Sequence, residues 1–188
     1  MQFADYENSV FPWIKAAVPD GEPEAGTDGG TGIPVDLMVM PFLGDLLVTF
    51  AVDDGDHFSL LQRSDVPEGM SDADLFALAK KNLTEQVEFT LTGTNYGGYG
   101  ILAGGDHEAG ALCLDFIWDA VLKQVGENLV IAVPAKDCLF MAAASDRAQI
   151  EGMAEVAKSI FENGDRQLTR NLFLLDASTR QFSVHGFF

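Results

Sequence analysis

The sequence predicts an α+β fold in which antiparallel β-hairpins alternate with helices. A helical pattern followed by two strand patterns occurs three times, with helix starts near residues 71, 108 and 146. The turns between paired strands are too short for a crossover, so each pair is expected to be antiparallel. Hairpins of this kind carry helices on one side, and we therefore expect all three helices to pack on one face of the sheet.

The first elements of the predicted body are a hairpin and a third, weaker strand. Residues 35–40 are mostly apolar, residues 41–45 are typical of a turn, and residues 46–52 are rich in β-branched and large apolar side chains. An acidic turn at 53–56 then precedes a short strand around residues 58–61.

The first helix-strand-strand unit begins at Ser71. An acid, Asp74, stands at the third helical position, which is close to the pattern of a capping box. Asp72 and Asp74 also face the positive end of the helix dipole, so we predict a helix start here. Strands are predicted to follow at 87–92 and 99–103, joined by a glycine-rich turn.

The second and third units have the same order. Gly126 ends the second predicted helix, Ser145 is the predicted cap of the third, and Asn163-Gly164 closes it. The predicted bounds are 108–124 for the second helix, 129–133 and 138–143 for its hairpin, 146–163 for the third helix, and 172–175 and 182–184 for the last hairpin.

Residues 1–188 are expected to form a single domain with three parts. In residues 1–18, apolar and aromatic side chains recur at spacings of three and four, which predicts a short helix and a second turn docked on the body. Residues 19–34 are predicted to be a flexible acidic loop rich in Pro and Gly, and residues 35–188 form the α+β body.

The balance of charge excludes two classes of partner. The chain has 29 acidic and 11 basic residues, a formal net charge of −18 at pH 7. Clustered Lys and Arg are needed to displace counterions from phosphates, so we expect neither nucleic acid nor an anionic membrane surface as a partner. Because the chain shows no long apolar run and no basic leader, we expect a cytoplasmic location.

The acidity is concentrated towards the N-terminus. Residues 1–75 hold 15 of the acidic residues but only Lys15 and Arg63 of the basic ones. A field of this sign attracts a basic protein surface. The alternative is that the acidity only keeps the protein soluble in a salty environment.

Four residues that often carry function are interpreted as parts of the core. Cys113 and Cys138 both lie in apolar stretches, so we predict two reduced thiols and no disulfide. Trp13 and Trp118 are interpreted as core anchors.

No nucleotide or hydrolase motif is complete. The glycines at 97–100 are followed neither by the Lys and Ser or Thr of a Walker loop nor by the helix that a dinucleotide-binding turn requires. No Gly-x-Ser-x-Gly sequence occurs. We therefore predict no cofactor and no catalytic residues, and we favour a protein that is not an enzyme.

The acid and histidine segments at 53–57 and 106–108 do not predict a metal site. Neither has the acid spacing of a calcium loop. A transition-metal site would need ligands from several elements, and convergence of His57, His107 and His185 is the arrangement that would supply them.

Three segments resemble a known family. They are AKKNL at 79–83, GDHEAG at 105–110 and VIAVPAKD at 130–137. Over residues 35–185, the order of these segments resembles the YtpQ-like family of bacterial proteins, a domain family without an assigned activity. The resemblance supports the α+β prediction and implies no reaction.

Two functional hypotheses remain. The first is a non-enzymatic binding or regulatory protein whose acidic surface engages a basic protein partner. The second is a small-molecule enzyme or ligand sensor, which predicts a concave pocket and a perturbed histidine. Its candidate ligand-binding residues are Tyr96, Tyr99, Asp106, His107 and Glu108. Either hypothesis is compatible with a homodimer.

Overall fold

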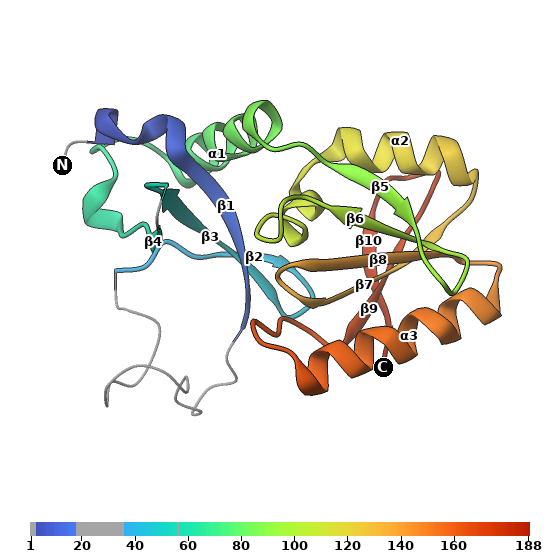
Figure 1. The fold of residues 1–188 in the computed structure, drawn as a ribbon. Helices are drawn as coiled ribbons and strands as arrows, with labels where there is room; N and C mark the ends of the chain where they lie inside the picture. The colour runs from blue at the N-terminus through green and yellow to red at the C-terminus, as the bar shows by residue number, and fades with distance from the viewer. Residues whose placement is uncertain (1–2, 18–35, 56) are drawn as a thin grey trace.

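The computed structural model describes residues 3–17, 36–55 and 57–188, which form two antiparallel β-sheets lying side by side (Figure 1). The predicted α+β class and the antiparallel pairing are confirmed. The sheets share one large apolar cluster, which runs from the strands of the first sheet to one face of the second. The predicted loop at 19–34 lies outside the described residues.

The first sheet contains four strands: β1 (Val10–Ala16), β2 (Met40–Leu43), β3 (Leu46–Asp53) and β4 (Phe58–Leu60). β3 pairs with β1 along its length, with β2 near its start and with β4 near its end. The hairpin turn is shorter than predicted, because Gly44 adopts a φ of +60° and Leu43 already pairs with Leu46. Residues 41–43, predicted as a turn, therefore lie in β2.

The N-terminal segment forms a strand, and the predicted helix is wrong. Two 3₁₀ turns, Phe3–Asp5 and Glu7–Ser9, lead into β1. Pro12 lies opposite Phe50 in the register. The sheet tolerates this proline because β1 is an edge strand, where a missing amide hydrogen interrupts no second ladder. The apolar strand β3 supplies a long-range partner that outweighs the local helical spacing.

The second sheet has six strands in the order β10-β9-β7-β8-β6-β5. Their bounds are β5 (Thr90–Gly93), β6 (Tyr99–Leu102), β7 (Leu129–Ala135), β8 (Cys138–Ala143), β9 (Asn171–Leu175) and β10 (Phe182–Phe187). The three α-helices of the described residues are α1 (Asp72–Gln86), α2 (Asp115–Val125) and α3 (Arg147–Asn163).

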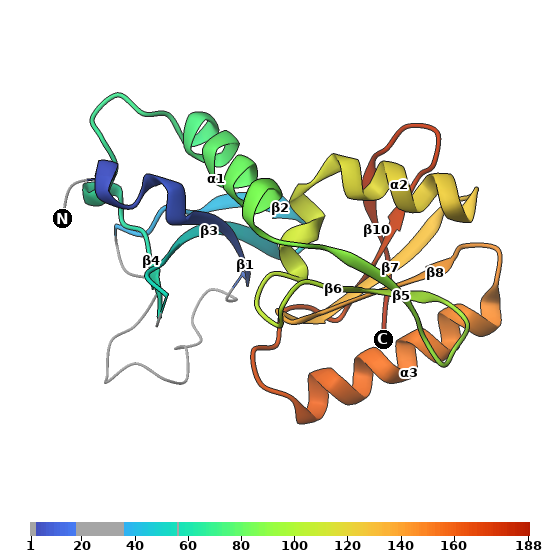
Figure 2. The ribbon, with the colours of Figure 1, turned by 45° about the horizontal axis from the view of Figure 1, so that its top comes forward.

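The helices do not all pack on one face, which corrects the prediction. Helices α2 and α3 cover opposite faces of the six-stranded sheet (Figure 1, Figure 2). In β7, Ile131 belongs to the cluster of α2, whereas Val130 belongs to the cluster of Met153 in α3. All seven residues of β7 are buried, and a strand that is apolar on both faces needs cover on both.

Local capping signals fix the helix starts. The predicted start of α1 is confirmed, since Ser71 Oγ accepts a hydrogen bond from the Asp74 amide at 3.1 Å and Asp74 reciprocates. The predicted helix at 108–124 is divided by Leu114 into a buried 3₁₀ segment, Ala109–Cys113, and α2. Helix α3 is capped by Asp146, and not by Ser145 as predicted.

Helix α1 packs against β1, and Asn82 joins them by donating to the carbonyls of Glu7 and Val10. Among the described residues, no helix has both the length and the apolar character needed to cross a membrane.

Candidate functional site

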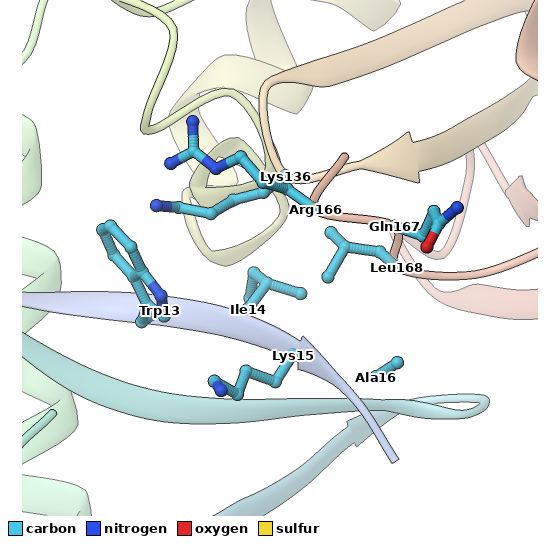
Figure 3. Close-up of a pocket in the computed structure, with 8 residues that line it drawn as sticks. All are labelled: Trp13, Ile14, Lys15, Ala16, Lys136, Arg166, Gln167 and Leu168. Carbon is cyan, nitrogen blue, oxygen red and sulfur yellow. The ribbon is translucent and has the colours of Figure 1, made fainter. Parts of the chain in front are cut away.

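A cavity of about 320 Å³ opens where the two sheets meet. Residues 13–16 of β1 line one side, and Lys136 and residues 166–168 line the other (Figure 3). In this view the amine of Lys136 points towards the ring of Trp13, with Ile14 and Leu168 further along the cavity. We call this space the junction cavity.

The backbone of Lys136 is held from two directions. Lys136 stands in the tight turn that joins β7 to β8, where Ala135 pairs with Cys138. Its amide donates to the Arg166 carbonyl at 3.0 Å, and its carbonyl accepts from the Ala109 amide at 3.0 Å. Both main-chain groups are therefore satisfied, and the turn presents the side chain to the cavity in a fixed position.

The amine of Lys136 is buried without a hydrogen-bond acceptor. The side chain is 8% exposed, and among the described residues no acceptor lies within hydrogen-bonding distance of Nζ. Nζ lies 2.8 Å from the ring centroid of Trp13, 5.2 Å from that of Phe58 and 3.6 Å from Asp106 Oδ1. Burial, reinforced by the positive charge of Arg166, lowers the pKa of Lys136 to about 8.

Asp106 joins two of the cations that line the cavity, Lys136 and Arg166. Its Oδ1 pairs with the Arg166 guanidinium and with Lys136 Nζ. The hydrogen bond from Arg166 keeps the pKa of Asp106 below its usual range, so this carboxylate is ionised at neutral pH. Arg166 also donates to the Gly105 carbonyl at 3.2 Å. Its φ of +63° costs about 1–2 kcal/mol in a residue with a Cβ, and the surrounding contacts hold it there.

Glu108 builds the loop that presents Asp106. Glu108 is 2% exposed, and its Oε1 accepts from the amides of Ala103 and Gly105, both at 2.8 Å. Gly104 and Gly105 both adopt positive φ values, which this tight loop requires. Glu108 is therefore a structural anchor behind the site.

His107 lies among aromatic rings beside the cavity. Its ring centroid is 5.1 Å from that of Phe11, 5.7 Å from Phe58 and 6.2 Å from Trp13. Burial, together with the nearby charge of Lys136, lowers the pKa of His107. The imidazole is therefore neutral at pH 7 and belongs to the aromatic wall behind Lys136.

The two candidate tyrosines lie elsewhere. Tyr96 donates to the Tyr99 carbonyl at 2.9 Å and packs on α3, where a Cβ added to Gly152 would meet Tyr96 Cβ at 2.7 Å. Tyr99 packs against the large cluster. The structure thus places Asp106 and His107 in contact with residues that line the junction cavity, while the tyrosines support the sheet and its helix.

The sequence interpretation missed three residues of the site. Trp13 was expected to be a core anchor, Lys136 an ordinary turn residue, and Arg166 stood in no motif. The sequence offers one signal for these residues, which is that Lys and Arg are rare in it. Of only 11 basic residues, three line this one cavity: Lys15, Lys136 and Arg166. Their meeting depends on β1 docking beside the β7–β8 turn, which no local pattern encodes.

Several acids of the N-terminal part have internal roles. Asp45, between β2 and β3, accepts from Thr169 at 2.6 Å and from Asn171 at 2.7 Å. Asp72 pairs with Arg63 at 2.7 Å, and Asp74 completes the cap of α1. Part of the acidity is therefore used in turns, caps and contacts between the sheets.

Neither cysteine offers a reactive thiolate. Cys113 is buried, Cys138 is partly buried, and both are free thiols. Burial raises the pKa of each to about 12. In residues 3–17, 36–55 and 57–188, no three His, Cys, Asp or Glu side chains come together in a way that would hold a metal ion.

No protein-family model, curated protein or solved structure matches this chain. The resemblance to the YtpQ-like family stays a prediction.

Proposed function

We propose that the protein binds a small organic anion, a carboxylate or a phosphate, in the junction cavity. The observation that carries the proposal is Lys136, which lines the cavity and whose amine is buried without a hydrogen-bond acceptor among the described residues. A buried ammonium without acceptors is unfavourable, because it has given up water and gained little in return. A bound anion supplies the missing acceptor.

The local charge favours an anion even though the whole chain is acidic. Lys15, Lys136 and Arg166 line the cavity, and no Asp or Glu is among its described lining residues. Asp106 contacts two of these cations, and Asp137 adds a second negative charge near Lys136. The three cations exceed these two carboxylates by one charge, where field lines are concentrated by low-dielectric walls.

The remaining walls suit the carbon part of a small molecule. Trp13, Ile14 and Leu168 present apolar surface beside the cations. The volume lies at the lower end of the range for small-molecule pockets, which is roughly 300–1,000 Å³. The ligand is therefore a short metabolite and not a nucleotide or a polymer.

Thermal unfolding with a panel of inorganic phosphate and short mono- and dicarboxylates tests the proposal. A ligand at one hundred times its Kd stabilises the folded state by about 2.7 kcal/mol, which moves the midpoint by several degrees. Lys136→Met should weaken binding by about tenfold or more, because a charge-assisted hydrogen bond is lost.

The control is Lys123→Met, which removes the same charge from an exposed position on α2. This variant should bind like the wild type. The proposal is wrong if no anion of the panel binds, or if both variants lose affinity equally.

The acidic residues support a second candidate, a basic protein partner. Asp5, Asp53 and Asp54 line one surface groove of about 430 Å³, and its described lining contains no basic residue. Capture of a binding protein at low salt and its release at high salt would support this candidate. Absence of any salt-sensitive partner would count against it.

A further inference from the structure

We infer that the Lys136 amine forms a Schiff base with the carbonyl group of a short oxo acid held in the junction cavity. The inference rests on the proposed anion binding, because the carboxylate of the oxo acid is the group that the cations retain. It adds a covalent step to that binding and names the class of ligand.

The surroundings of Lys136 favour the neutral amine that such a step requires. Its ammonium is shielded by Trp13 and Phe58, and Arg166 adds a second positive charge nearby. With a pKa of about 8, roughly a quarter of the amine is unprotonated at pH 7.5, compared with about 0.1% for an exposed lysine. Desolvated lysines beside another cation are the form that attacks carbonyl compounds.

The amine also has no hydrogen-bond partner among the described residues that would compete with a ligand. Its side chain is more than nine-tenths buried, it lines the cavity, and Asp106 Oδ1 at 3.6 Å is beyond hydrogen-bonding distance. Formation of a bond to carbon therefore breaks no hydrogen bond to the described residues. The turn that holds Lys136 is fixed through its amide and carbonyl, so the amine approaches from one direction.

The atoms of the step balance without an external oxidant or reductant. The Nζ lone pair attacks the carbonyl carbon, and the C=O electron pair moves to oxygen. Asp106, ionised and 3.6 Å from Nζ, accepts one N–H proton and passes it to this oxygen, giving a carbinolamine. The second N–H proton takes the same route to the hydroxyl group, which leaves as water. The products are the imine on Lys136 and one water molecule.

The remaining cations select an oxo acid over a simple aldehyde or ketone. Arg166 donates to Gly105 and Asp106, which leaves further guanidinium N–H groups in the cavity wall, and Lys15 lines the same space. A carboxylate bound there holds the adjacent carbonyl near Lys136, while Ile14 and Leu168 accommodate a short carbon chain.

Reductive trapping on the wild-type protein tests the inference. The protein is incubated with pyruvate and sodium cyanoborohydride, and the modified peptide is identified by mass spectrometry. We expect one pyruvate adduct, on Lys136, at least about tenfold above any other lysine, because the others keep the ordinary reactivity of a protonated amine. Trapping should increase from pH 6 to pH 8, and acetone, which lacks the carboxylate, should label Lys136 much less.

Two variants refine the result. Lys136→Arg keeps the positive charge and should give no adduct at that position, whereas Lys123→Arg should be trapped like the wild type. Asp106→Asn should slow trapping without weakening pyruvate binding, since the role of Asp106 here is to move a proton and its negative charge does not attract the carboxylate.

The outcomes separate the inference from the proposed function. If calorimetry shows that pyruvate binds but no adduct forms on Lys136, the proposed anion site is supported and the Schiff base is overturned. An adduct spread over exposed lysines such as Lys81 and Lys123 also overturns it. If no carboxylate or phosphate binds at all, both the proposed function and the inference fail.

Discussion

Replacing Lys136 by methionine is expected to stabilise the protein at pH 7 and to have a much smaller effect near pH 10.5. Methionine keeps an unbranched apolar chain against Trp13 but removes the ammonium. In the wild type this group is 8% exposed and has no hydrogen-bond acceptor among the described residues. The variant therefore removes a buried charge and leaves the packing nearly intact.

The size and sign follow from the pKa of Lys136, about 8 against an ordinary value of 10.5. Below pH 8 both states carry the proton, and the folded state bears the full penalty of burying it. Between pH 8 and 10.5 only the unfolded state stays protonated, so wild-type stability rises with pH. The difference between these two pKa values corresponds to about 3 kcal/mol of stability that the buried charge removes at pH 7.

Urea unfolding of the wild type and Lys136→Met at several pH values from 7 to 10.5 measures this directly. The free energy of unfolding of the variant should exceed that of the wild type by about 2–3 kcal/mol at pH 7, and the gap should close as pH rises. Lys123→Met is the matched control and should show no such pH dependence. A constant gap between wild type and Lys136→Met would refute the reasoning, because it would mean that Lys136 titrates normally.

Three further substitutions test the supports of the fold and the site. Glu108→Ala should destabilise the protein by about 2–4 kcal/mol in urea unfolding, because the buried Ala103 amide and the partly buried Gly105 amide lose their acceptor; Glu108→Gln, which keeps an acceptor oxygen, should be milder. Asp146→Ala should lower stability by about 1 kcal/mol through loss of the cap of α3, measured in the same way. Gly152→Ala should destabilise despite the better helix propensity of alanine, because the new Cβ would lie 2.7 Å from Tyr96 Cβ; a higher thermal midpoint for this variant would contradict the packing of Tyr96 on α3.

Patterns that act over a few residues predicted the fold well. The cap at Ser71 and the left-handed Gly126 mark helix ends, and the hairpins of β7–β8 and β9–β10 lie where the sequence predicts them. Features that depend on distant partners were missed. The N-terminal strand forms because β3 offers an apolar edge, although its own side chains suggest a helix.

The sequence of β7 already indicates that the strand is buried on both faces. Its seven residues, Leu129–Ala135, contain no polar side chain, whereas a strand with one solvated face alternates. A continuous apolar run of this kind indicates cover on both sides, which α2 and α3 provide. The apolar run of β7 alone therefore predicts one helix on each face of the sheet.

The candidate site likewise combines residues that a local pattern predicts with residues that only the tertiary structure brings together. Asp106 and His107 are predicted as candidates because carboxylates and a histidine stand together at residues 106–108. Lys136 and Trp13 lie far apart in the sequence, and only the contact between the sheets brings the ammonium to the indole. Burial of a lysine is a tertiary property, so sequence alone predicts two neighbours of the cavity-lining residues but not Lys136 itself.

The position of the junction cavity leads to a last prediction, about hydrogen exchange. A ligand between β1 and residues 166–168 would contact both sheets, and it binds only when they are docked. The free energy of binding therefore stabilises the docked state of the two sheets. Because β1 is an edge strand and its detachment would open the cavity, binding also suppresses local opening of β1. Amide exchange in β1 should slow in the presence of the bound anion, while exchange in β5, at the other sheet's outer edge and away from the cavity lining, should change little. Equal slowing in β1 and β5 would indicate global stabilisation by an anion bound elsewhere, and would argue against a ligand at the junction of the sheets.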